Sequence, residues 1–109
     1  MSSSTSTNFE AVLSREDATN WLSGKSADEV FDQIKKLAGN KKKTIHRENA
    51  IVLFASYFEG VQPLLELEIL RNWVIVLTLA GDNNQVVAER ARDLSRIIFD
   101  HFSKYSCKG

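Results

Sequence analysis

Apolar residues recur along the chain at helical spacing, in segments separated by glycine or by short polar runs. A first short helix is predicted after Ser14, whose hydroxyl suits an N-cap, and it should end at Gly24. Its apolar face carries Ala18, Trp21 and Leu22. The pattern therefore begins with a helix of only two or three turns.

The second helix has the clearest start signal in the chain. Ser26 and Glu29 have the spacing of a capping box, in which each side chain accepts a hydrogen bond from the other residue's backbone N–H. A single apolar stripe follows, formed by Val30, Ile34, Leu37 and Ala38. Gly39 comes directly after that stripe and is predicted to end the helix in the left-handed conformation.

A third helix is predicted between Thr44, which can serve as its cap, and Gly60. Its apolar positions spread over more than half of the helix circumference: Ala50, Ile51, Leu53, Phe54, Tyr57 and Phe58. An arc this wide predicts a central helix that is packed on several sides.

The fourth helix is predicted from Pro63 to Ala80, and its last eight residues from Trp73 onward are apolar all round. A strand over 73–79 is the local alternative, but no second candidate strand exists to pair with it. A fifth helix follows the polar turn 81–84. Its narrow apolar stripe contains Val87, Ala91, Leu94, Ile98, Phe102 and Tyr105.

Together these elements predict an all-α fold of four to five helices that pack as an antiparallel bundle or a short helical stack. A single helical domain is expected over residues 13–106. Residues 1–12 begin with a Ser/Thr-rich run that has little to bury, and they are predicted to form a flexible tail.

Composition narrows the class of protein further. The 109 residues include 14 basic and 14 acidic side chains, and 43% are hydrophobic, which is typical of a soluble globular domain. The apolar stretch 73–80 is too short to span a bilayer, and no membrane partner is predicted. One cysteine excludes an internal disulfide, which favours a cytoplasmic or nuclear location.

Catalytic chemistry finds little support in the sequence. The only histidines are His46 and His101, the only cysteine is Cys107, and none of them is spaced as a pair of metal ligands. Asp100 and His101 could be imagined as an oriented base for Cys107, but adjacent residues on a helix point in different directions and Cys107 lies near the end of the chain. We therefore predict no enzyme activity, no metal and no cofactor.

The most distinctive polar feature is a run of basic side chains that contains no acid between residues 35 and 47. Its members are Lys35, Lys36, Lys41, Lys42, Lys43 and Arg47. Such a cluster can bind a phosphate backbone or another anionic partner, although it lacks interleaved aromatic residues that would stack on bases. The alternative is a solvated loop, since lysines after a helix C-terminus are favoured by the helix dipole.

A second candidate surface is apolar. Ile75, Leu79 and Phe99 are predicted to lie on a face that either belongs to the core or receives a partner helix or a second copy of the chain.

The last two helices carry a family resemblance. Asn84, Val87, Ala91 and Leu94 follow a Gly-Asp turn and an apolar helix, and residues 63–105 resemble one unit of a HEAT-type repeat. The same pattern is similar to the last helix of the N-terminal helical bundles of transcription elongation factors. Either resemblance implies a helical interaction domain, in the first case a short HEAT-like stack.

These observations lead to two functional predictions. The first is a non-enzymatic adaptor or scaffold module that binds another protein, or a second copy of itself, through a helical surface. The alternative is a nucleic-acid-associated factor that uses the basic residues between 35 and 47.

Overall fold

The all-α prediction is confirmed by the computed structural model, which describes residues 9–60 and 66–108. Within these residues there are six helices and no strand. They are α1 (Arg15–Leu22), α2 (Ala27–Ala38), α3 (Thr44–Gly60), α4 (Glu66–Arg71), α5 (Trp73–Ala80) and α6 (Gln85–Lys108). One more helix is present than predicted, because the predicted fourth helix is interrupted.

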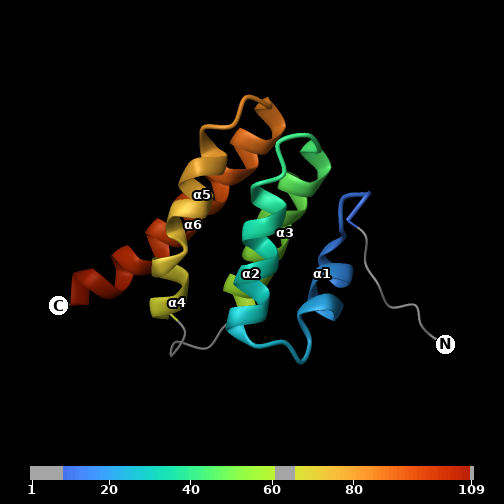
Figure 1. Cartoon of the computed structure of the whole chain (residues 1–109). Helices are drawn as coiled ribbons and strands as arrows, with labels where there is room; N and C mark the ends of the chain where they lie inside the picture. The colour runs from blue at the N-terminus through green and yellow to red at the C-terminus, as the bar shows by residue number, and fades with distance from the viewer. Residues whose placement is uncertain (1–8, 61–65, 109) are drawn as a thin grey trace.

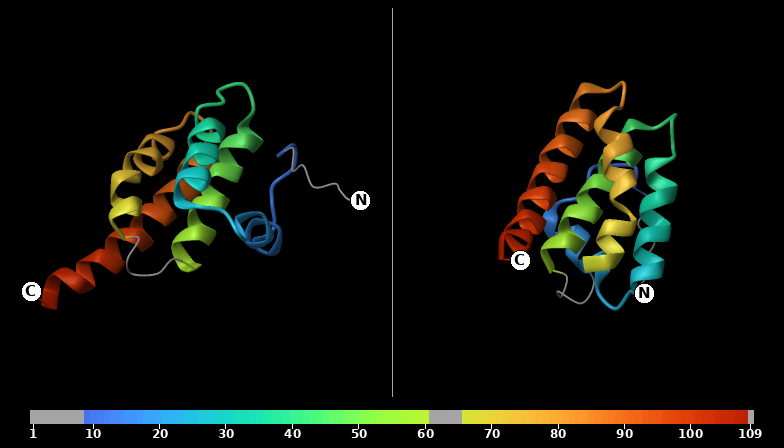
Figure 2. Two further views of the ribbon diagram at one scale, coloured as in Figure 1. Left: turned by 60° about the horizontal axis from the view of Figure 1, so that its bottom comes forward. Right: turned by 90° about the vertical axis from the view of Figure 1, so that its left-hand side faces the viewer.

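Two helical hairpins form the body of the molecule, as Figure 1 shows. Helices α2 and α3 make one hairpin, α5 and α6 make the other, and α3 packs against α6 between them. The turns of both hairpins lie at the same end of the molecule (Figure 1). Helix α1 packs on α3, on the side away from α5, as the two views of Figure 2 also show.

The capping box at the start of α2 is confirmed. The backbone N–H of Glu29 donates to Ser26 Oγ at 3.3 Å, and the N–H of Ser26 donates to Glu29 Oε1 at 3.1 Å. The predicted left-handed stop at Gly39 is wrong, because its φ of −83° and ψ of −2° are right-handed. The chain turns instead through Asn40, whose side-chain oxygen accepts from the backbone N–H groups of Lys42 and Lys43, both at 3.1 Å.

Helix α3 occupies the central position that its wide apolar arc predicted. Its buried residues point in almost every direction around the helix and include three polar side chains, Arg47, Asn49 and Ser56. Thr44 is the first helical residue and does not precede the helix as a cap. Phe54 is the largest fully buried side chain and meets Phe31 of α2 edge to face, with ring centroids 5.5 Å apart.

The predicted helix 63–80 is broken at Asn72. At this residue the φ of −104° leaves the helical range, and hydrogen bonds of the tighter i to i+3 type replace the regular ones on both sides. Asparagine favours such a turn because it is a weak helix former. The segment 73–80 is helical, so rejection of the strand was correct. The predicted start at Pro63 lies outside the described residues.

Residues 9–13, here called the strap, comprise the last four residues of the predicted tail and the first residue of the predicted helical domain. The ring of Phe9 is buried with 7% of its surface exposed, and it belongs to the same core cluster as residues of α2, α3, α5 and α6. The strap has no helix or strand of its own. The core of the described residues therefore includes one side chain from the predicted tail.

Candidate functional site

An exposed apolar stripe runs along α4 and α5. Val74 and Leu77 are 62% and 51% exposed and lie three residues apart on one face of α5. Leu70, which is 46% exposed, precedes them on α4, before the break at Asn72. Helices α4 and α5 follow one another along one side of the molecule (Figures 1 and 2). We call these three residues the α5 stripe.

The α5 stripe replaces the apolar surface that the sequence predicted. Ile75 and Leu79 are buried, with 9% and 3% of their surfaces exposed, because α5 turns this side toward α6 and the core. Of the two alternatives given for them, these residues therefore follow the one in which they belong to the core. Phe99, the third predicted residue, is 66% exposed on α6. The exposed face of α5 is the opposite one. Because this helix is apolar all round, the sequence pattern alone cannot tell which face is exposed.

The predicted basic cluster is partly neutralised within the molecule. Lys43 Nζ lies 2.8 Å from Glu10 Oε1, and Lys36 Nζ lies 3.3 Å from Asp32 Oδ2. Arg47 is buried. Lys35, Lys41 and Lys42 are exposed and make no ion pair with any residue of the described ranges. Of the six predicted residues, Lys36, Lys43 and Arg47 therefore make contacts within the protein, whereas Lys35, Lys41 and Lys42 remain exposed without such an ion pair.

Arg47 joins the turns of the two hairpins. Its Nη1 donates to the carbonyl oxygen of Asn40 at 2.8 Å, and its Nη2 donates to Asp82 Oδ2 at 3.2 Å. Nε also lies 2.8 Å from Asp82 Oδ1, but outside hydrogen-bond geometry, so that contact is electrostatic. Asp82 Oδ2 accepts a further bond from the N–H of Asn84 at 2.8 Å. Arg47 is thus a structural residue.

The strap is held to α3 by one side chain. Asn49, which has no exposed surface, donates from Nδ2 to the carbonyl oxygens of Phe9 and Ala11 at 3.2 and 3.0 Å. Its Oδ1 accepts from the N–H of Leu13 at 2.8 Å. All three bonds go to backbone atoms. The carboxamide therefore gives an extended segment the partners that a neighbouring strand would otherwise supply.

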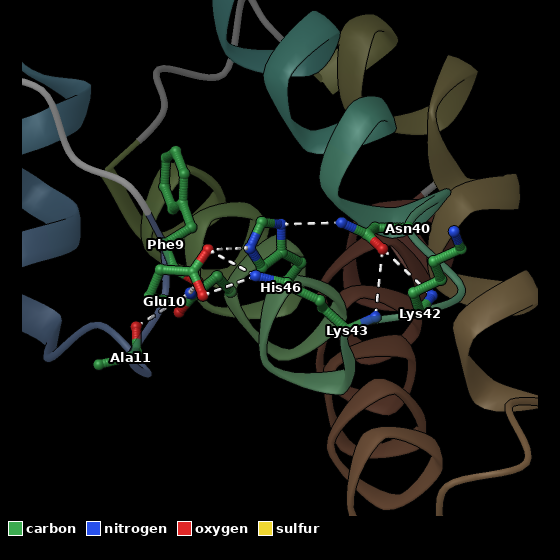
Figure 3. Close-up of polar contacts among 8 residues, drawn as sticks. Phe9, Glu10, Ala11, Asn40, Lys42, Lys43 and His46 are labelled. Carbon is green, nitrogen blue, oxygen red and sulfur yellow. Dashed lines mark hydrogen bonds and ion pairs between the residues drawn. The ribbon is translucent and has the colours of Figure 1, made fainter.

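A second set of polar contacts holds the side chain of Glu10 (Figure 3). Lys43 Nζ donates to both carboxylate oxygens, at 2.8 and 3.0 Å, and His46 Nε2 lies 3.2 Å from Oε2. Asn40 fixes the tautomer of the ring. The side-chain oxygen of Asn40 accepts from backbone N–H groups, so the NH₂ group of Asn40 faces His46 Nδ1 at 3.1 Å. Because an NH₂ group donates, Nδ1 accepts and the ring proton is assigned to Nε2.

These contacts lower the pKa of the Glu10 carboxyl below its ordinary value of 4.5, first through the hydrogen bond from Lys43 and then through that from His46. The ionised carboxylate therefore stabilises the docked strap above a pH of about 4.5. This contribution is lost as the pH falls through the lowered pKa.

We expect the strap to loosen in acid, and Trp21 fluorescence can report it because the Phe9 ring contacts Trp21 edge to face at 6.0 Å. The measurement uses a Trp73→Phe background, which leaves Trp21 as the single tryptophan. Glu10→Gln in the same background should remove the acid transition. A transition of unchanged size in that variant would show that another group controls it.

Phe9 has a strained backbone. Its φ of 58° lies in the left-handed region, which is unfavourable for a bulky L-residue and costs about 1–3 kcal/mol. Two contacts of Phe9 maintain this conformation. Its ring packs on Trp21, and its carbonyl oxygen accepts a hydrogen bond from Asn49. The strap is therefore held in place by its binding site against its own backbone preference.

A shallow groove lies beside the strap, along the face of α3 that is turned toward α1 and α6. Its apolar lining comprises Leu13, Ile51, Val52, Ala55, Leu94 and Ile97. Ion pairs stand near its two ends: Arg15 with Glu59, and Arg90 Nε with Glu48 Oε1 at 3.7 Å. No feature of the sequence pattern predicted this groove, since it is formed by three helices that are distant in the chain.

The remaining chemical candidates are few. In the described ranges no group of three His, Cys, Asp or Glu side chains could hold a metal ion. His101 packs its ring edge-on against Phe58 and Phe102, at 5.2 Å in each case. No described helix combines the length and the apolar character needed to cross a membrane.

Comparison of the chain with protein-family models, with curated proteins and with solved structures finds no match. The resemblance of residues 63–105 to a HEAT-type unit or to an elongation-factor bundle therefore stays a prediction. The fold defines the class only, an all-α domain of packed helical hairpins.

Proposed function

We propose that this chain is a non-enzymatic protein-binding module, an adaptor or scaffold that engages another protein or a second copy of itself through the α5 stripe. The observation that carries the proposal is the exposure of Val74 and Leu77 on α5, whose other face is already buried in the core, together with the exposure of Leu70 at the end of α4. Isolated apolar residues on a surface are ordinary, but a row at helical spacing is typical of a partner-binding helix.

The α5 stripe has dimensions that suit a helical partner. Val74 and Leu77 cover about one helical turn of α5, or roughly 5 Å, and Leu70 extends the apolar surface onto the end of α4. A partner helix would present anchors at the same spacing and bury them against these side chains. An apolar contact of this kind should depend little on salt concentration.

The test compares Val74→Glu/Leu77→Glu with Asn20→Glu, which introduces a charge at an exposed position of α1, a helix that packs on α3 on the side away from α5. Self-association is measured by sedimentation, and partner binding by affinity capture followed by titration of the purified partner. We expect the double variant to lose association at least tenfold while Asn20→Glu retains it. Equal association of all three proteins, each folded by circular dichroism, would refute the proposal.

Nucleic-acid binding is the second candidate, and the exposure of Lys35, Lys41 and Lys42 favours it. Anisotropy of labelled DNA and RNA at low and physiological salt distinguishes it from the first. Phosphate binding would weaken steeply with salt and would disappear in Lys41→Glu/Lys42→Glu, whereas the α5-stripe variants would leave it unchanged.

A further inference from the structure

We propose that the place where the strap lies is a binding site for an extended peptide segment of another protein, in which an aromatic residue is followed directly by an acidic one. The strap occupies this site as a displaceable ligand supplied by the chain itself. The inference goes beyond the function proposed for the α5 stripe, because it concerns α1, the α2–α3 loop and the start of α3.

The backbone of the occupant is bound by one side chain of α3. Asn49 has no exposed surface while the strap is docked, and its carboxamide faces the strap. It satisfies two carbonyl oxygens and one N–H of the strap, and none of these contacts depends on the occupant's side chains. Peptide-binding sites commonly obtain affinity from main-chain hydrogen bonds of this kind.

Two side-chain subsites add selectivity. The aromatic subsite contains Trp21, which meets the Phe9 ring edge to face. The acidic subsite contains Lys43 and His46, which donate to the Glu10 carboxylate, while Asn40 orients the histidine ring (Figure 3). Lys41 and Lys42 are exposed in the same α2–α3 loop and add positive charge to it. An acidic residue directly after an aromatic one fits both subsites together.

The strap can leave without unfolding the helices. Helix α1 begins at Arg15 and is capped by Ser14, whose Oγ accepts from the N–H of Asp17 at 3.1 Å, so its cap is independent of the strap. The left-handed φ of Phe9 opposes docking of the strap. The half-exposed ion pair between Glu10 and Lys43 adds only a modest hold. Most of the strap's retention comes from the buried Phe9 ring and the three bonds to Asn49, so a competing segment has to replace both.

The probe is a fluorescein-labelled peptide of residues 8–14, Asn-Phe-Glu-Ala-Val-Leu-Ser, added to the full chain and followed by anisotropy. Wild type is compared with Glu10→Ala and with Phe9→Ala/Glu10→Ala, which weaken the strap but keep Asn49, Lys43, His46 and Trp21. We expect apparent affinity to rise from wild type to Glu10→Ala to the double variant. A strap that is closed nine-tenths of the time or more lowers the wild-type affinity at least about tenfold.

Two controls establish where the probe binds. A peptide with alanine in place of both Phe and Glu should bind none of the proteins. Lys43→Glu introduced into the double variant should weaken the original peptide, and a peptide with Lys in place of Glu should recover binding to that protein. Lys43 suits this exchange because its side chain is about half exposed.

The outcome that overturns the proposal is absence of binding to both strap variants at millimolar peptide while their circular dichroism remains native. The strap would then be an ordinary part of the core. Glu10→Ala serves as the control for damage to the core, because it removes a surface contact and leaves the buried Phe9 ring in place. A wild-type dimer that disappears in Phe9→Ala would also overturn it, by assigning the site to the strap of a second copy.

Discussion

Replacing Arg47 with alanine is expected to lower the free energy of unfolding by about 3–5 kcal/mol, because it leaves a largely buried carboxylate without its counter-charge. The Asp82 side chain is only 14% exposed, and the Arg47 side chain 11%. The substitution also removes the donor to the Asn40 carbonyl. Urea unfolding monitored by circular dichroism measures the loss.

Arg92→Ala is the matched control. Arg92 lies exposed on α6 and makes no ion pair with a residue that the structure describes, so its removal should change stability by no more than about 0.5 kcal/mol. In the double variant Arg47→Ala/Asp82→Ala the cost should be smaller than the sum of the two single effects, since no unpaired charge remains. Additive effects would contradict a direct interaction between the two side chains.

Replacing Asn49 with leucine, which has a similar size, should release the strap and destabilise the protein by about 2–3 kcal/mol. The substitution removes three hydrogen bonds to the strap backbone. Each backbone group that stays buried without a partner costs about 1–3 kcal/mol, and this cost ends when the strap moves into water. Once released, the strap regains its partners from solvent, which limits the total.

Hydrogen exchange distinguishes local release from general destabilisation. The amide of Leu13 should lose its protection in Asn49→Leu, while amides in the middle of α2 and α6 stay protected at a level set by global unfolding. Asn20→Ala, at an exposed position of α1, serves as the control and should leave the Leu13 amide protected. Retained protection of Leu13 in Asn49→Leu would show that Asn49 does not hold the strap.

The helices were predictable because their signals are local. Ser26 and Glu29 are three positions apart, and their reciprocal hydrogen bonds depend on no other part of the fold. The wide apolar arc of the third helix likewise indicated its central position. The left-handed turn at Gly39 was not observed because Asn40 supplies an alternative turn by accepting two backbone N–H bonds.

The candidate sites were less predictable because they depend on contacts between distant segments. Nothing local indicates that Arg47 meets Asp82, 35 positions later, and so leaves the cluster of basic surface residues. Asn49 looks like an ordinary polar residue of a helix until the strap is placed beside it. On α5 the apolar residues surround the helix, so periodicity could not decide that Val74 faces water while Ile75 faces the core.

The strap and its holder are also separated in the order of synthesis. Phe9 precedes Asn49 by 40 positions, so it is synthesised before the residue whose side chain donates to its carbonyl oxygen. Helical hairpins such as α2–α3 form from sequence neighbours and fold quickly, whereas a contact over 40 positions must wait for both segments. During synthesis the Phe9 backbone is therefore without its Asn49 partner until the start of α3 has been added.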